Sequence, residues 1–135
     1  MAKAKEAQLL TFTLPNKVGQ LSAVSDLIAA AKINIVAILA AESGSQAEFR
    51  LVTAKDPKAR KALAPLGVEI KEEAALFVDM ANKAGSLGKL AKRLAGASVN
   101  INRVWATSFR GKTTTAVLQT SDDKKALASL RKKKK

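Results

Sequence analysis

Hydrophobic and polar residues follow two different periods along the first part of the chain. From Gln8 to Leu14 an apolar residue takes every second position, which is the period of a strand with one buried face. From Leu21 to Ala31 apolar residues recur at intervals of three and four, as they do on one side of an amphipathic helix. The pattern therefore predicts a strand that leads through a loop into a helix.

The next forty residues complete a small unit. Strands are predicted for Ile33–Ala41 and Ala47–Ala54, with a turn at Ser43-Gly44-Ser45 between them. A short helix is predicted to begin at Asp56, and a short strand is predicted from Val68 to Lys71. The resulting order, β-α-β-β-α-β, is typical of ferredoxin-like folds.

The second half of the chain repeats the first, 66 positions later. The stretch Asn16-Lys17-Val18-Gly19-Gln20-Leu21 matches Asn82-Lys83-Ala84-Gly85-Ser86-Leu87, and Ile33-Asn34-Ile35 matches Val99-Asn100-Ile101. Two separated motifs in one register indicate a duplicated unit of about 65 residues.

The second unit is predicted to lack its last strand. Its strands are expected at Ala75–Met80, Val99–Ser108 and Lys112–Thr120, and its helices at Ser86–Ala97 and Asp122–Leu130. The lysines that follow would repel one another along a strand, so one sheet edge is expected to be open or filled by another chain.

The predicted fold class is therefore α+β. We expect two ferredoxin-like units side by side, each with an antiparallel sheet and helices on one face, over residues 8–72 and 73–130, with a basic tail at residues 131–135. Val36, Ile38 and Phe77 add apolar residues to the strand faces opposite the helices. Because such faces are usually covered, a homodimer is expected.

Composition narrows the range of possible functions. The 135 residues contain no Cys and no His, which excludes disulfides, thiolate nucleophiles, imidazole bases and the commonest metal ligands. An enzyme would have to rely on pairs such as Ser86 with Lys89, for which no oriented base is evident. We therefore expect a protein that is not an enzyme and needs no cofactor or metal.

Charge and hydropathy suggest a cytoplasmic location. There are 24 basic and 11 acidic residues, for a net charge of +13, and the last five residues are all basic. Such a tail is expected to be solvated and to bind nucleic acid weakly and non-specifically at most. The longest apolar run, Ile35–Ala41, is far shorter than the roughly 18 residues that span a bilayer, so no membrane association is expected.

The repeated residues resemble a known family. A strand ending in Asn-x-x-Gly-x-Leu, then an amphipathic helix, then Ile-Asn-Ile opening the next strand is similar to the ACT domain, a small amino-acid-sensing module. The resemblance covers both units and looks like the stand-alone tandem ACT proteins that carry no enzyme domain. It implies that the loop of one unit faces the Asn-Ile strand of the other. One implied site joins Asn16, Lys17, Val18, Gly19, Gln20 and Leu21 to Asn100 and Ile101, and the other joins Asn82, Lys83, Ala84, Gly85, Ser86 and Leu87 to Asn34 and Ile35.

Residue chemistry leaves two interpretations of these loops open. Gly19 and Gly85 precede helix starts, whose free amides suit a carboxylate, and Asn16 and Asn82 can pair with an ammonium or a carboxylate group. Alternatively, each Asn closes its own turn and each Gly permits it. Serine-binding members of the family carry a polar residue two places before the Asn, where this chain has apolar residues, so an aliphatic or aromatic amino acid is expected.

The predicted function is thus the regulatory, non-catalytic binding of an amino acid, with an unidentified enzyme as the regulated partner. The alternative is a basic ferredoxin-like module that binds nucleic acid. RNA-recognition modules of this fold order need aromatic residues on the third strand, however, and here those strands read Ala47-Glu48-Phe49-Arg50 and Thr113-Thr114-Thr115.

Overall fold

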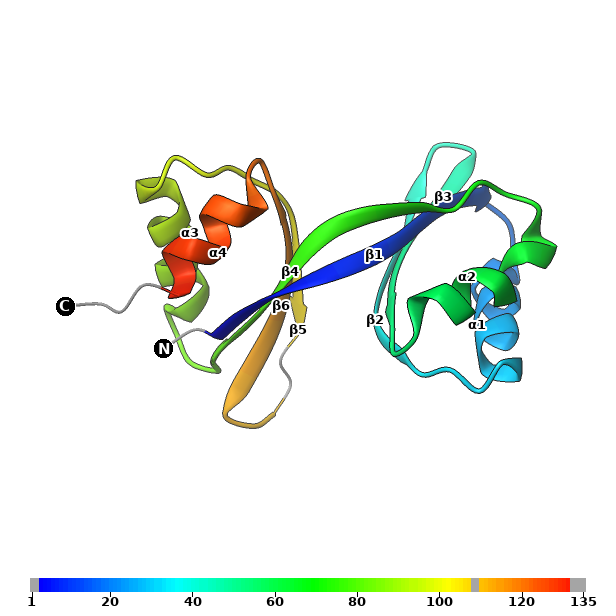
Figure 1. The fold of residues 1–135 in the computed structure, drawn as a ribbon, viewed down its shortest axis with the longest axis horizontal. Coiled ribbons are helices and arrows are strands. Elements are labelled where there is room, and N and C mark those ends of the chain that lie inside the picture. Colours follow the sequence, from blue (N-terminus) through cyan, green and yellow to red (C-terminus); the bar gives the residue numbers. More distant parts are fainter. Residues whose placement is uncertain (1–2, 108–109, 132–135) are drawn as a thin grey trace. The chain divides into compact units, whose positions relative to one another are not determined.

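The computed structural model describes residues 3–107 and 110–131, which fall into two compact units (Figure 1). The first unit comprises residues 8–73, and the second comprises residues 3–7 together with 74–131. In chain order the elements are β1 (Lys3–Pro15), α1 (Gln20–Ala30), β2 (Ile35–Ser43), β3 (Gln46–Thr53), α2 (Asp56–Ala62), a 3-10 turn η1 (Ala64–Leu66), β4 (Lys71–Ala81), α3 (Ser86–Gly96), β5 (Ile101–Thr107), β6 (Thr113–Thr120) and α4 (Asp123–Arg131). The predicted α+β class is confirmed.

Both units have the strand order of a ferredoxin-like sheet. The order in the first unit is β2-β3-β1-β4, to which β4 contributes residues 71–73. In the second unit it is β1-β4-β6-β5, to which β1 contributes residues 3–7. The pairs β1–β3, β2–β3, β4–β6 and β5–β6 are antiparallel. Strands β1 and β4 therefore each serve both units.

In the first unit, helices α1 and α2 cover one face of the sheet. Alternate residues of β1 and β3 face these helices, and the rings of Phe12 and Phe49 stack with centroids 5.2 Å apart. The buried core residues are Leu10, Phe12, Leu14, Val24, Ile28, Ile33, Phe49, Leu51, Ala59, Leu63 and Ile70. The two-residue strand period and the helical spacing seen in the sequence thus meet in one apolar layer.

The second unit builds the same layer from different residues. Helices α3 and α4 pack beside each other, and the Nε of Arg93 in α3 donates to the carbonyl oxygen of Ser129 in α4 at 2.9 Å (Figure 1). The buried residues are Leu76, Val78, Met80, Leu90, Leu94, Val99, Ala116, Leu118, Ala126, Leu127 and Leu130.

The sheet edge that the sequence left open is filled by the start of the same chain. Ala4 packs against the core of the second unit, and its carbonyl oxygen accepts a hydrogen bond from the Nε of Arg131 at 3.3 Å. The ammonium group of Lys5 lies 5.8 Å from the ring centroid of Phe77. Strand β1 starts at Lys3, whereas the sequence predicted a strand from Gln8. The charged segment before Gln8 can form a strand because it also contains small residues, such as Ala4, that can face a core.

Two predicted strands are one in the structure. Strand β4 runs without a break from Lys71 to Ala81, whereas separate strands were expected at Val68–Lys71 and Ala75–Met80. Val68 itself lies in a bend just after Gly67, whose φ of 69° lies in the left-handed region. A glycine in the left-handed conformation interrupts an extended strand. The observed strand therefore starts at Lys71, three residues later than predicted.

The repeat is not free of gaps. Thr11 of β1 pairs with Arg50 of β3, and Phe77 of β4 pairs with Val117 of β6. Phe77 lies 66 positions after Thr11, but Val117 lies 67 positions after Arg50, so the second hairpin holds one extra residue. The helices that follow are offset by the same amount, since α2 begins at residue 56 and α4 at residue 123.

Three further features bear on the predictions. No helix within residues 3–107 and 110–131 is both long and apolar enough to cross a bilayer. The last four lysines of the predicted tail lie outside the described residues, while Arg131 ends α4. Val36 and Ile38 of the edge strand β2 are 50% and 37% exposed, and Phe77 is half-buried.

Candidate ligand-binding loops and a pocket

Each predicted loop ends on a glycine in the left-handed conformation. Gly19 has φ 92° and ψ −2°, and Gly85 has φ 91° and ψ −10°, and each is the N-cap of the helix that follows. A side chain would be strained at such a φ, which accounts for glycine at both positions. Neither helix start receives a side-chain capping bond. In α3 the N–H of Ser86 donates to the carbonyl oxygen of Lys83 at 3.2 Å, so in this helix only the amides that follow Ser86 remain available to an anion.

The two loop asparagines hold the loops to the neighbouring hairpins. Asn16 Nδ2 donates to Glu42 Oε2 at 3.0 Å, and Asn82 Nδ2 donates to the carbonyl oxygen of Gly111 at 2.9 Å. The backbone N–H of each Asn also donates to its hairpin. Each amide nitrogen therefore binds a neighbouring hairpin and does not close the turn of its own loop. Within residues 3–107 and 110–131 no donor reaches the Oδ1 of either side chain, so that oxygen is available to an ammonium group.

The loops also present exposed apolar side chains. Val18 is 101% exposed, Leu21 is 52% exposed and Leu87 is 49% exposed. Gln20 folds back and donates from Nε2 to the carbonyl oxygen of Pro15 at 2.8 Å. Among the remaining residues of the predicted loops, Lys17, Lys83 and Ala84 are exposed and Ser86 is half-buried. Apolar surface therefore adjoins the free helix amides in both units.

Asn34 and Asn100 lie just before strands and not within them. The carbonyl oxygen of Asn34 accepts a hydrogen bond from the backbone N–H of Ala54 at 3.1 Å. The backbone N–H of Asn100 donates to Ser121 Oγ at 3.0 Å, and its Nδ2 donates to Asn102 Oδ1 at 2.8 Å. Both Asn side chains are exposed, so this strand-start position explains why a residue disfavoured in strands occurs twice.

Within one unit the loop and the asparagine strand lie far apart. Asn16 bonds to Glu42 near the end of β2, whereas Asn34 precedes the start of the same strand. Ile35 and Ile101 are half-buried against the core of their own unit, each beside a bulge. A site that combines a loop with an asparagine-bearing strand therefore needs two units. The pairing of each loop with the strand of the other unit stays a prediction.

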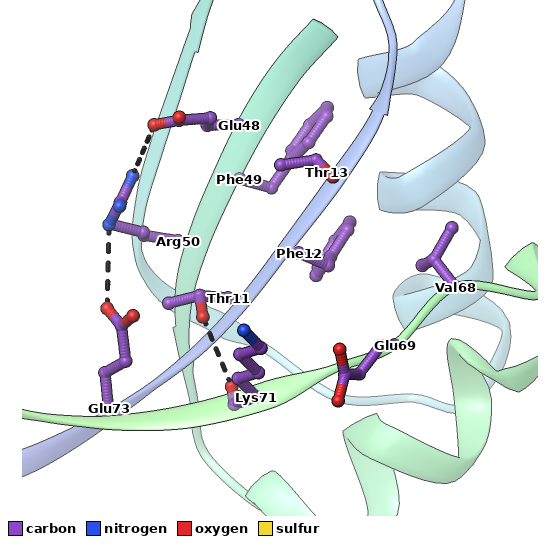
Figure 2. Close-up of a pocket in the computed structure, with 10 residues that line it drawn as sticks. All are labelled: Thr11, Phe12, Thr13, Glu48, Phe49, Arg50, Val68, Glu69, Lys71 and Glu73. Carbon is purple, nitrogen blue, oxygen red and sulfur yellow. Dashed lines mark hydrogen bonds and ion pairs between the residues drawn. The ribbon is translucent and has the colours of Figure 1, made fainter.

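The first unit contains a pocket that the sequence did not single out (Figure 2). Its volume is about 410 Å³. It lies beside β1 and β3, where the chain passes through residues 68–71 into β4. The lining residues are Thr11, Phe12, Thr13, Glu48, Phe49, Arg50, Val68, Glu69, Lys71 and Glu73.

Arg50 is the central charge of this pocket. Its Nη1 lies 3.1 Å from Glu48 Oε1, and its Nε lies 3.8 Å from Glu73 Oε1, which is too long for a direct hydrogen bond (Figure 2). The Arg50 side chain is only 13% exposed. Two carboxylates already offset the guanidinium, so the pocket does not favour a free anion. No group of three acidic side chains among the described residues is placed to hold a metal ion.

Little in the sequence could have marked this pocket. Thr11 and Thr13 alternate with apolar residues in the sequence, as do Glu48 and Arg50, and this is the ordinary pattern of a strand with one solvent-facing side. Only the register shows that Thr11 lies opposite Arg50 and Thr13 opposite Glu48.

Solved structures show which folds the chain resembles. It matches protein BT0572 from Bacteroides thetaiotaomicron with 25% identity and a TM-score of 0.87, over 95% of this chain and 88% of that one. It matches the regulatory subunit of aspartate kinase from Thermus thermophilus with 19% identity and a TM-score of 0.71, over 96% and 92% of the two chains. The corresponding subunit from Thermus flavus gives 16% identity and a TM-score of 0.65, over 96% and 93%.

The fold is that of a tandem ACT protein. The likenesses span both units and nearly the whole of each matched chain, which confirms the predicted pair of ferredoxin-like ACT units. No family model matches the sequence, and no curated protein does. Because a shared fold does not establish a shared function, the role of the chain is argued from its own residues.

Proposed function

We propose that this chain is a non-catalytic regulatory protein that binds a small apolar or aromatic amino acid through the loops at residues 16–21 and 82–87. The observation that carries the proposal is the repeated left-handed glycine at each helix start, beside free amides and an exposed leucine. Few duplicated surface features would be kept so alike without a shared constraint. A turn alone needs the glycine, but it does not need an exposed Leu21 and Leu87.

Each part of an amino acid has a partner in this arrangement. The carboxylate would accept hydrogen bonds from the first amides of α1 or α3, where the helix dipole is positive. The ammonium group would donate to the Oδ1 of Asn16 or Asn82. The side chain would be covered by Leu21 or Leu87 and by Ile101 or Ile35 of the other unit, and full burial would contribute about 1.5–3 kcal/mol.

Regulation would follow from linkage between ligand binding and the arrangement of the units. A ligand that contacts both units stabilises one arrangement, and it therefore favours whichever partner binds that arrangement. The likeness to regulatory subunits of aspartate kinase supports an enzyme as that partner. The exposed residues of the edge strand β2 support a homodimer as a further part of the assembly.

A thermal melt of the protein with each standard amino acid in turn tests the proposal. A ligand present at 100 times its Kd adds about 2.7 kcal/mol to the stability of the folded state. We expect one apolar or aromatic amino acid to raise the melting temperature and serine to leave it unchanged. If no amino acid raises it at millimolar concentration, the proposal is wrong.

A matched pair of variants locates the site. L21S with L87S replaces the two exposed leucines, and we expect it to abolish the ligand-dependent rise. A29S with A95S changes two exposed alanines of the same helices, and we expect the rise to remain. Equal loss in both variants would contradict a site at the loops.

A further inference from the structure

The two units differ sharply in charge. The first unit holds eight basic and seven acidic residues, for a net charge of +1. The described part of the second unit, residues 3–7, 74–107 and 110–131, holds twelve basic and four acidic residues, for a net charge of +8. Because the units share a fold, the fold itself does not require this excess.

Part of the excess lies on α3 and the loop before it. Residues 82–98 contain four basic residues and no acidic one, whereas the matching residues 16–32 contain two basic residues and Asp26. Lys89 takes the place of Ala23, and Lys92 takes the place of Asp26 itself. The duplicated helices therefore differ in charge: α1 contains one acidic and no basic residue, whereas α3 contains three basic and no acidic residues.

These lysines are free and face away from the sheet. Lys89 and Lys92 are exposed, and neither forms an ion pair within residues 3–107 and 110–131. Leu90 and Leu94 of the same helix are buried in the core, which fixes the opposite side of α3 as the outer side. Figure 1 shows α4 beside α3 on the same side of the strands of this unit.

Helix α4 adds to the same surface. Lys124, Lys125 and Arg131 are exposed, while Asp122 and Asp123 accept hydrogen bonds at the start of the helix from backbone and hydroxyl donors. We call this surface the basic helix face, and it consists of Lys89, Lys92, Lys124, Lys125 and Arg131.

We propose that the basic helix face binds double-stranded nucleic acid through its phosphates, without reading the bases. This activity is separate from amino-acid binding and needs only the second unit. Lysines contact phosphates as point charges, and such contacts position a protein on a duplex without carrying sequence information. The strongly positive, lysine-rich character of the face matches protein–nucleic acid interfaces.

Other polyanionic partners fit this face less well. Protein–protein interfaces are depleted in lysine and enriched in aromatic residues at their centres, and neither α3 nor α4 contains an aromatic residue. Membrane-bound helices need a free apolar side, whereas Leu90, Leu94 and Leu127 are buried within the unit. Single strands usually stack their bases on aromatic rings, which favours the duplex over the single strand.

Fluorescence anisotropy with a labelled duplex of about 20 base pairs tests the proposal. For duplex DNA the logarithm of the binding constant falls with the logarithm of salt concentration by about 0.9 per phosphate contact. We expect micromolar binding near 0.1 M salt, with a slope that corresponds to about four to six phosphates.

Two variants of equal net charge test whether binding depends on where the basic residues lie or only on the total charge of the protein. K89A with K92D gives α3 the residues that α1 carries, and it lowers the net charge by 3. K58D with K61A lowers the net charge by the same amount on α2, where both lysines are exposed. We expect the α3 variant to bind at least about tenfold more weakly, with the slope reduced by about 2, and the α2 variant to stay within about twofold of the parent.

Each alternative predicts a different result. Equal weakening in both variants would show that net charge alone drives binding, and would overturn the proposal. Loss of binding on removal of residues 132–135, with the α3 variant unaffected, would assign binding to the tail instead. Tighter binding to polyglutamate or to phosphatidylserine vesicles than to the duplex would identify another partner. Circular dichroism of both variants serves as the check on folding, and we expect the α3 variant to leave the amino-acid melts unchanged because the two activities are independent.

Discussion

The two units of this chain share a core and differ at their surfaces. Ile28 and Leu94 occupy matching positions of α1 and α3, and both are almost completely buried. On the sheet face opposite the helices, the pair Thr11 and Arg50 of the first unit corresponds to Phe77 and Val117 of the second. One unit thus carries an ionic pocket where the other carries apolar residues.

The helices show the same divergence in charge. Helix α1 contains no basic residue, while α3 contains three, although both begin at a left-handed glycine. The comparison teaches that duplication preserved what the fold and the loops require, and left the outer surfaces to acquire separate chemistry.

Removal of residues 1–7 should have the largest effect, and on the second unit alone. It deletes the strand that fills the edge of the second unit and the packing of Ala4 on its core, which exposes β4 to solvent. Trp105 is the single tryptophan and lies in β5, so its fluorescence reports on this unit. We expect its urea midpoint to fall steeply or its folded signal to vanish.

The matched control is the removal of the last four residues. These lysines follow α4, and their loss should leave the fluorescence midpoint unchanged. An intact midpoint after removal of residues 1–7 would contradict the assignment of that strand to the second unit.

Arg50 and Val117 occupy matching positions on the sheet faces opposite the helices. Exchanging the two residue types should lower the stability of the two units by unequal amounts. Val117 is 4% exposed and pairs with Phe77 and Trp105, so V117R would bury a charge among apolar groups and cost about 3 kcal/mol. R50V removes the guanidinium beside Glu48 and Glu73, whose side chains are more than one-third exposed, so it should cost less than about 1 kcal/mol. Urea unfolding followed by circular dichroism measures both, and equal losses would refute the contrast.

Alanine at the two left-handed glycines should lower stability moderately. G19A and G85A each place a Cβ at a φ near 90°, at a cost of about 1–2 kcal/mol. G88A is the control, since Gly88 lies in α3 with ordinary φ and open space around it, and should stabilise by up to about 1 kcal/mol. Thermal unfolding that ranks G88A with the other two would rule out this account of the loops.

The loop asparagines should have the smallest effect on stability. N16A and N82A each remove one exposed hydrogen bond to a hairpin, so we expect losses of less than about 1 kcal/mol in urea unfolding. Both variants should nevertheless weaken amino-acid binding, because Oδ1 is lost as well. A large loss of stability with unchanged binding would assign these residues to the turn alone.

Local patterns were sufficient to predict the helices and most of the strands of each unit. The alternation in Gln8–Leu14 and the helical spacing in Leu21–Ala31 both reflect one buried face, which is a local property. The strand at residues 3–7 could not be predicted in the same way, because its neighbour in the sheet, β4, begins more than sixty residues later. The extra residue of the second hairpin was missed because the single offset of 66 positions already aligned both repeated motifs, which lie before the turn of that hairpin.

The site was predictable only where the chemistry is local. A glycine between a strand and a helix indicated the left-handed turns at Gly19 and Gly85. Whether Asn16 binds the hairpin or a ligand depends on a contact with Glu42, 26 residues away, which no local pattern encodes. The pocket around Arg50 likewise depends on register between strands.

Amide NMR with the amino acid identified by thermal melting tests the central claim most directly. The backbone signals of Gly19 and Gly85 and the side-chain amide signals of Asn34 and Asn100 should shift together and saturate with one dissociation constant or two similar ones. Shifts confined to residues around Arg50, with both glycine signals unmoved, would contradict binding at the loops.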